Sequence, residues 1–307
     1  MAGRGELTDA AWEQIRPLLP AMDGRGKPWR DHRQVIDGVL WRLRTGAPWR
    51  DLPEWYGPWQ TAYERFARWE ADGTWARLLE HAQVRDNAVG RIEWTVSVDS
   101  TINRAHQHAA GTRKKGSLAG NKLEDSQRSA ARQALGRSRG GLTTKVHLAV
   151  DGRGLPLSIV LTPGNVNDST MFDAVLNAIY VPRSGMGRPR RRPDRVLADK
   201  AYSSRAIRAA LRHRGIKATI PERSDQVGNR RRKGSADGRR PAFDREAYKH
   251  RNVVERCFNR LKQFRAVATR FDKLATRYQA GLQVCSLILW LRGCRDHRAN
   301  RLRRLRG

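Results

Sequence analysis

The sequence predicts an α/β protein in which a mixed sheet covered by helices follows a small all-helical segment. Eight of the ten tryptophans lie before residue 90, so the composition changes near Gly90. Beyond residue 93, short alternating apolar runs separated by turn residues indicate strands. Three strands, then alternating helices and strands, then two closing helices form an order that suits one mixed sheet with helices on its faces. Within 307 residues we therefore expect a helical unit over residues 1–90, a sheet-based unit over residues 91–292 and a basic tail over residues 293–307.

The first unit contains two helices around a turn. Apolar residues recur at helical spacing over residues 36–43, and the stretch TGAP ends that helix. A second helix covers about residues 59–69. The pair resembles a helix-turn-helix, in which the second helix would read DNA and place Arg65 and Arg68 on its wetter side. A plain helical bundle with tryptophans in its core fits equally well, because the motif has no diagnostic residue.

The second unit begins with the strand WTVSVD and a hairpin around the turn DGRG. We expect strands over residues 94–99, 142–150, 155–163, 195–199 and 217–221, and helices over residues 171–179, 204–215, 245–264 and 274–292. Three basic stretches rich in Gly or Ser, residues 104–141, 183–195 and 223–240, are expected to be loops or arms that order on DNA. Solvated loops with no specific role are the ordinary alternative.

The charge favours a polyanionic partner. The chain has 61 Lys and Arg against 30 Asp and Glu, a formal net charge of +31, so its long-range field attracts polyanions such as nucleic acid. A membrane surface is disfavoured, because the most apolar run, LQVCSLILWL, is too short to span a bilayer. The first residues lack the apolar core of a signal peptide, and the three cysteines form no CxxC pair. We expect a reduced, cytosolic protein.

Three carboxylates are candidates for chemistry. Asp99 closes the strand WTVSVD and Asp199 closes RVLAD, and active sites of sheet proteins commonly lie where strands end. For either aspartate alone, a turn or cap role is favoured by roughly two to one. Asn165, Asn167 and Asp168 in the segment TPGNVND, residues 162–168, are expected either near this site or as a turn and helix cap.

Glu255 lies in the basic stretch AYKHRNVVERCFNRLKQF. At about 100° per residue, Glu255 shares one helix face with Tyr248, Arg251, Asn259 and Lys262, while apolar residues fill the opposite side. A simple surface ion pair between Arg251 and Glu255 would explain this acid too. Together with two strand-borne aspartates, however, Glu255 could help to hold two Mg²⁺ ions, and such a pair supports phosphoryl transfer.

At this point a family resemblance is clear. Asp99 in VSVDST, Asp199 in LADKAYSS and the spaced row of Tyr248, Arg251, Glu255 and Lys262 resemble the DDE transposases of bacterial insertion sequences, within the insertion-sequence-five (IS4/IS5-like) family. The segments LTDAAWEQIRPLLP, GAPWRDLP and SRGGLTTKVHLAVDGRGLPLSIVLTPGN are also similar to that family. The resemblance covers nearly the whole chain, and no catalytic position departs from the pattern.

The resemblance implies a fold, an activity and roles. The sheet-based unit would be an RNase H-like DDE domain that cuts and joins double-stranded DNA at the element's terminal inverted repeats and at a target. Asp99, Asp199 and Glu255 would be the catalytic residues and would ligate two Mg²⁺ ions, with Mn²⁺ as a substitute. Tyr248, Arg251 and Lys262 would contact the DNA near the cut. The protein would act as a homo-oligomer, a dimer on DNA, in the bacterial cytoplasm at the nucleoid.

Two other classes of function remain open from the sequence. A catalytically inactive, transposase-derived regulator would need only the helices and basic arms to bind DNA. An RNase H-like nuclease would share the metal chemistry and differ in its substrate. His106 and His108 invite a zinc or nuclease interpretation, but a solvated basic loop is favoured by roughly five to one, since no cysteine partners follow at zinc spacing.

Overall fold

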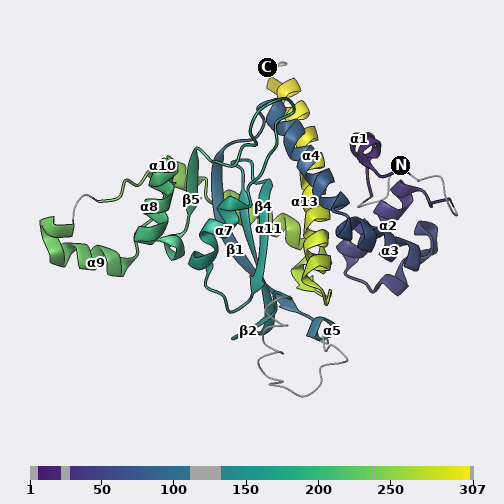
Figure 1. Cartoon of the computed structure of the whole chain (residues 1–307), viewed down its shortest axis with the longest axis horizontal. Coiled ribbons are helices and arrows are strands. Elements are labelled where there is room, and N and C mark those ends of the chain that lie inside the picture. The colour runs from purple at the N-terminus through teal and green to yellow at the C-terminus, as the bar shows by residue number, and fades with distance from the viewer. Residues whose placement is uncertain (1–5, 22–27, 111–132, 238–239, 305–307) are drawn as a thin grey trace.

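The computed structural model describes residues 6–21, 28–110, 133–237 and 240–304 (Figure 1). The helical segment at the N-terminus contains four α-helices: α1 (Asp9–Ile15), α2 (His32–Thr45), α3 (Trp59–Ala71) and α4 (Thr74–Ala88). Short 3-10 turns lie between them: η1 (Arg16–Leu18), η2 (Trp49–Asp51) and η3 (Glu54–Tyr56). The two expected helices are therefore present as α2 and α3.

Local sequence explains the limits of these helices. Asp31 caps α2 by accepting a hydrogen bond from the Arg33 N–H, and Gly46 ends it in the left-handed region at φ 73°. Pro58 directly precedes α3. The connection over residues 46–58 contains η2 and η3, so it is longer than the tight turn of a typical helix-turn-helix.

A mixed sheet forms the centre of the molecule. Its strands are β1 (Thr95–Ala105), β2 (Gly136–Ser138), β3 (Gly141–Val150), β4 (Pro156–Pro163), β5 (Arg195–Ala198), β6 (Lys217–Thr219) and β7 (Thr269–Arg270). β3 pairs antiparallel with β1, β2 and β4, whereas β1, β5 and β6 run parallel to one another. β7 pairs with the far end of β1. The mixed sheet and the hairpin around DGRG are as the sequence predicts.

The first strand is longer than expected. We expected β1 to end at Asp99, but it continues to Ala105 because β3 pairs with it as far as Arg104. On its other edge, β5 pairs only with Thr95–Val98, and β7 pairs only with Arg104 and Ala105. Asp99 therefore lies inside a strand, at the start of an edge segment that neither neighbour covers.

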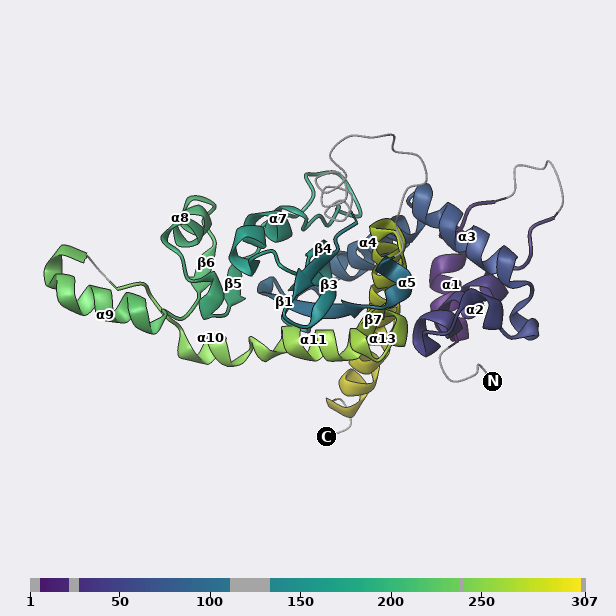
Figure 2. The same cartoon turned by 90° about the horizontal axis from the view of Figure 1, so that it is seen from below.

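Helices and turns cover both faces of the sheet. In chain order they are α5 (Gln107–Ala110), η4 (Asp168–Met171), α7 (Phe172–Asn177), η5 (Lys200–Tyr202), α8 (Arg205–His213), α9 (Ser224–Lys233), η6 (Gly234–Asp237), α10 (Arg245–Lys249), α11 (Asn252–Lys262), α12 (Arg265–Ala268) and α13 (Ala275–Arg304). Figure 2 shows α9, α10 and α11 following one another along one side of the molecule, with α9 at the end far from α1–α3.

Four expectations about these segments need correction. The helix expected over residues 245–264 is two helices, because hydrogen bonds between residues three apart tighten the chain around His250 and Arg251. Residues 223–240, expected to be a loop, contain α9 and η6, although α9 buries no side chain. The expected tail from residue 293 continues α13 as far as Arg304. Residues 104–141, also expected to be a loop, contain the end of β1, α5 and β2, and residues 111–132 of this stretch lie outside the described residues.

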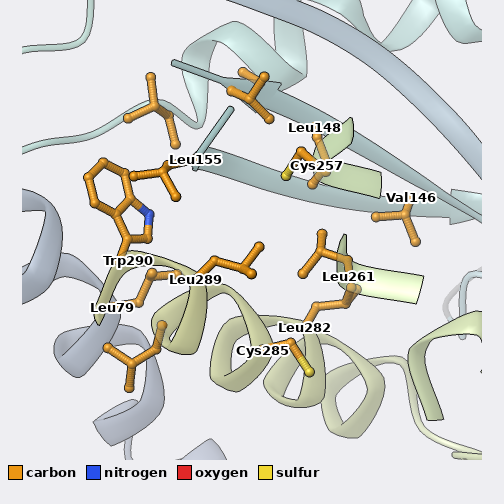
Figure 3. Close-up of a cluster of buried hydrophobic side chains, with 14 of the residues drawn as sticks. Leu79, Val146, Leu148, Leu155, Cys257, Leu261, Leu282, Cys285, Leu289 and Trp290 are labelled. Atoms are coloured by element: carbon orange, nitrogen blue, oxygen red, sulfur yellow. The ribbon is translucent and has the colours of Figure 1, made fainter. Parts of the chain in front are cut away.

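One hydrophobic core joins the two expected units. Figure 3 shows α13 residues such as Leu282, Leu289 and Trp290 packed between Leu79 of α4 and Leu148 of β3. α4 packs along α13, so the core continues across the predicted boundary near Gly90. None of the described helices has the length and apolarity needed to cross a lipid bilayer.

Candidate active site

Asp99 in β1 lies next to Asp199, which directly follows the adjacent parallel strand β5. The last registered pair of β1 and β5 is Val98 with Ala198, and each aspartate is the next residue along. Adjacent strands are about 4.8 Å apart, so the two carboxylates start from neighbouring backbone positions. The Asp199 carboxylate also accepts a hydrogen bond from the Ala201 N–H at 2.9 Å and so caps η5.

The Asp99 carboxylate is in an environment that disfavours negative charge. Burial raises its pKa, and the nearby charge of Asp199 adds to that rise. Hydrogen bonds from the Ser100 N–H at 2.8 Å and from the Arg251 guanidinium at 3.1 Å act in the opposite direction. A cation placed between the two aspartates would offset both the burial of the Asp99 charge and its repulsion by Asp199.

Arg251 connects Glu255 to this pair. One guanidinium nitrogen, Nη1, donates to Asp99, and the other, Nη2, donates to Glu255 Oε1 at 2.5 Å. The ring of Tyr248 lies 5.9 Å from the same guanidinium. The Glu255 side chain is 54% exposed, so it faces solvent on one side and Arg251 on the other. The expected polar row is thus present, although the break after α10 places Tyr248 on a separate helix.

Lys262 reaches the same uncovered edge of β1. Its Nζ donates to Thr101 Oγ1 at 2.7 Å. Thr101 is two residues beyond Asp99 and therefore shares its face of the strand. α11 thus spans the open edge segment, holding Asp99 through Arg251 at its start and Thr101 through Lys262 at its end.

A second polar group lies on the opposite face of β1. The Ser100 hydroxyl donates to Asp168 Oδ1 at 2.7 Å, and the Lys145 ammonium forms an ion pair with the same oxygen at 2.9 Å. Burial raises the pKa of the Tyr202 phenol well above its usual range, and the charges of Asp99, Asp168 and Asp199 add to that rise. Tyr202 therefore lies close to all three acids.

The two expectations for the segment TPGNVND are both correct. Asn167 caps η4 by accepting a hydrogen bond from the Ser169 N–H, and Asp168 approaches the site from the far face of β1. Sequence reasoning missed Thr101, Lys145 and Tyr202. Period-two alternation from Asp99 would have found Thr101, whereas the other two come from strands or turns whose pairing the sequence did not reveal.

The aspartate pair fits the chemistry of a divalent cation. Carboxylate oxygens are the donors that Mg²⁺ prefers, and burial and the charge of Asp199 already disfavour the charged form of Asp99. Among the described residues, however, no three His, Cys, Asp or Glu side chains gather as a metal-binding group. In this arrangement Glu255 faces the Arg251 guanidinium instead.

The two arginines expected on the wet face of α3 differ. Arg68 is exposed, as expected. The expected exposure of Arg65 is wrong, because it is only 6% exposed. Its guanidinium stacks 4.3 Å from the Trp29 ring and donates to His32 Nδ1 at 2.6 Å. The polar side chain is buried because flanking aromatic rings cover it, which helical periodicity alone does not reveal.

The chain matches known proteins over most of its length. A family model described as a transposase DDE domain matches residues 91–290, and one described as a putative transposase of the IS4/5 family matches residues 7–79. A putative transposase for insertion sequence element IS402 from Burkholderia cepacia is 38% identical over 155 residues, which span 50% of this chain and 65% of that protein. A putative transposase for element IS6501 from Brucella ovis is 32% identical over 151 residues, 49% of this chain and 100% of that protein.

An uncharacterised protein from Sinorhizobium fredii is 40% identical over 110 residues, which span 35% of this chain and 83% of that protein. No solved structure matches the chain. The DDE-domain match includes Asp99 in β1, Asp199 directly after β5, and Glu255 in α11. Because the DDE-domain match covers more than half of the sequence, the chain belongs to the DDE transposases; the match over residues 7–79 and the relatives for IS402 and IS6501 place it with those of insertion sequences, in the IS4/5 family.

Proposed function

We propose that this chain binds the terminal inverted repeats of its insertion sequence and catalyses metal-dependent DNA cleavage and strand transfer. The observation that carries the proposal is the register of β1 and β5, which puts Asp99 and Asp199 side by side, with Glu255 linked to Asp99 through Arg251. Family membership supports a DNA substrate. The formal net charge of +31 supports attraction to the DNA backbone.

The fold supports an RNase H-like catalytic unit. Three antiparallel strands, β4, β3 and β1, continue into the parallel strands β5 and β6, with α11 and α13 on one face. The helices α2 and α3 would then supply DNA contacts in the manner of a helix-turn-helix. Arg68 stays in this proposal because it is exposed, and Arg65 is omitted because it is buried. A dimer on DNA remains a prediction.

In this proposal Asp99, Asp199 and Glu255 hold Mg²⁺, and the neighbouring backbone positions of Asp99 and Asp199 support their sharing it. Bound Mg²⁺ would activate the attacking oxygen and stabilise the leaving oxygen of a phosphodiester. Arg251 has a double role. Its fork now binds two carboxylates, and the same fork can bind two phosphate oxygens.

The remaining side chains position the DNA strand. Lys262 would hold a phosphate beside Thr101 as a point charge, and Tyr248 would contact the base or phosphate nearest to Arg251. Ser100 donates its backbone N–H to Asp99 and its hydroxyl to Asp168, so it fixes the orientation of the aspartate from the opposite face of the strand.

A cleavage assay on inverted-repeat DNA tests the proposal. Purified wild-type protein with Mg²⁺ is expected to nick the element's ends and to join them to target DNA. Asp99→Asn is expected to bind the same DNA and to do neither, because an amide is a weak metal ligand. If wild type binds the ends and leaves them intact with Mg²⁺ or Mn²⁺, the chain is a DNA-binding regulator and the proposal is wrong. Faster cleavage of an RNA–DNA hybrid would instead indicate an RNase H-like nuclease.

A further inference from the structure

A basic cavity lies beside α11, next to the face that carries Glu255. Its volume is about 510 Å³, and it is lined by Arg153, Val253, Arg256, Asn259 and Arg260. Three of these five side chains are arginines and none is acidic. Arg153 belongs to the DGRG turn between β3 and β4, so the cavity lies between that turn and the helix.

The charge around the cavity is unbalanced. The buried carboxylate of Asp86 in α4 pairs with Arg85 at 2.8 Å, Arg91 at 3.3 Å and Arg153 at 3.3 Å. Three guanidinium groups therefore share one acid, which holds Arg153 in place without neutralising the region. Asp151 and Glu93 also lie near the turn. Neither acid lines the cavity.

The two arginines of α11 have unused capacity to bind an anion. Arg256 is exposed, and no carboxylate of the described residues lies within salt-bridge distance of it. Arg260 lines the cavity and donates to the Gly154 carbonyl, which orients its guanidinium; its Nε is buried, so only its other N–H groups are within reach of an anion. Arg256 and Arg260 are four residues apart and therefore stand one helical turn apart, about 6 Å along the axis.

The cavity adjoins the candidate active site along the helix surface. At about 100° per residue, Asn259 is displaced by about 40° from Glu255, and Arg256 and Arg260 by about 100° and 140°. Asn259 therefore lies between the face of Glu255 and the two arginines. A DNA strand held at Glu255 would pass over Asn259 to reach the arginines without leaving α11.

We propose that Arg153, Arg256, Asn259 and Arg260 form an arginine pocket that binds backbone phosphates of the duplex DNA next to the cut. The inference rests on the proposed function, because it takes the bound polyanion to be the DNA that is cleaved. Guanidinium forks bind phosphate oxygens in pairs. Contacts to the backbone carry no sequence information, so the pocket would add affinity equally for the inverted repeat and for unrelated duplex DNA.

Salt-dependent DNA binding tests the pocket. Fluorescence anisotropy is measured on labelled duplexes without divalent metal, so that no DNA is cut. The full-length variants are Arg256→Gln and Asn259→Asp, which alter exposed side chains and leave the anchoring contacts of Arg153 and Arg260 intact. Arg212→Gln is the matched control, because it removes the same charge from an exposed position on another helix, α8. Thermal melting checks that each variant is folded.

Arg256→Gln is expected to reduce the slope of log affinity against log salt by about 0.9, the effect of one lost phosphate contact. The ratio of wild-type affinity to Arg256→Gln affinity would then be about threefold smaller at about 200 mM salt than at about 50 mM salt. Asn259→Asp is expected to weaken binding as well, and Arg212→Gln to keep the wild-type slope. The losses should be equal on inverted-repeat and unrelated duplexes.

Three results would overturn the inference, and they are distinguishable. If wild type binds duplex DNA and both pocket variants match Arg212→Gln in slope and affinity, the pocket does not contact DNA while the proposed function stands. If wild type binds no duplex DNA at all, the proposed function is lost and the pocket with it. A loss seen on an RNA–DNA hybrid but not on duplex DNA would also exclude the pocket as a duplex site.

Discussion

Replacing Glu255 by Gln separates a metal ligand from a surface ion pair. The side chain is 54% exposed, and its charged partner among the described residues is Arg251 at 2.5 Å. Exposed ion pairs contribute about 0.2–1 kcal/mol, and each kcal/mol corresponds to about 2–4 °C in a protein of this size. The midpoint of thermal unfolding should therefore fall by no more than about 4 °C.

The effect on cleavage should be far larger. A bound metal ion stabilises transition-state charge by several kcal/mol, and a loss of about 2.7 kcal/mol already slows a reaction about 100-fold. We therefore expect Glu255→Gln to reduce Mg²⁺-dependent nicking of inverted-repeat DNA at least about 100-fold. DNA affinity, measured by anisotropy at the same salt, should stay within about threefold of wild type, because the change removes no phosphate contact.

Glu246→Gln is the matched control. Glu246 is also an exposed helical glutamate in an ion pair, with Lys249 at 2.8 Å, but it lies outside the row that meets Asp99. Cleavage by this variant should equal that of wild type. If Glu255→Gln cuts DNA as fast as Glu246→Gln, Glu255 is a surface counter-ion and its assignment as a metal ligand is refuted.

Three further predictions concern neighbouring groups. Lys262→Met removes the cation that donates to Thr101 and should reduce the salt slope of DNA binding by about 0.9; an unchanged slope would exclude a phosphate contact. Burial lowers the pKa of His147 from 6.5 to about 4, so the unfolded state takes up the proton first as the pH falls. About 3 kcal/mol of stability, present above pH 6.5, should be lost between pH 6.5 and 4. The free energy of unfolding in urea, measured at several pH values, should therefore fall more steeply for wild type than for His147→Gln; an equal fall in the two proteins would contradict this. Arg270 is fully buried and donates to Thr144 and to three backbone carbonyls, so Arg270→Ala should cost about 3 kcal/mol or more in urea unfolding; a loss below about 1 kcal/mol would show that water replaces these bonds.

Much of the fold could be predicted from local patterns. Alternating apolar residues placed the strands and the hairpin, and helical spacing placed α2, α3 and α11. The buried face of α11, Val253, Val254, Cys257, Phe258 and Leu261, is the one that the helical wheel predicts. These features depend on neighbours in the sequence, which is why one sequence is enough to find them.

Features set by distant contacts could not be predicted in this way. β1 passes Asp99 because β3 pairs with it as far as Arg104, and register between strands far apart in sequence is not encoded in either strand alone. Arg65 looks exposed on a helical wheel, yet Trp29 and Trp69 cover it. The break before α11 likewise has no proline or glycine to announce it.

The candidate site likewise has residues that the sequence indicates and contacts that only the structure reveals. Asp99, Asp199 and Glu255 were identified from their positions and from the family resemblance, and the structure shows the first two in neighbouring register. The Arg251 bridge between Asp99 and Glu255 involves residues about 150 positions apart, so no local pattern could reveal that these carboxylates share one guanidinium.

The most direct measurement is electron paramagnetic resonance of Mn²⁺ bound to the protein with inverted-repeat DNA. If Asp99, Asp199 and Glu255 form one two-metal centre, wild type should show a spin-coupled Mn²⁺ pair, since such ions lie about 3.5–4 Å apart. Asp99→Asn, Asp199→Asn and Glu255→Gln should each abolish the coupled signal, while Glu246→Gln should keep it. A coupled signal that survives all three substitutions, or wild-type protein that binds no Mn²⁺ in the presence of DNA, would contradict the assignment of the active site.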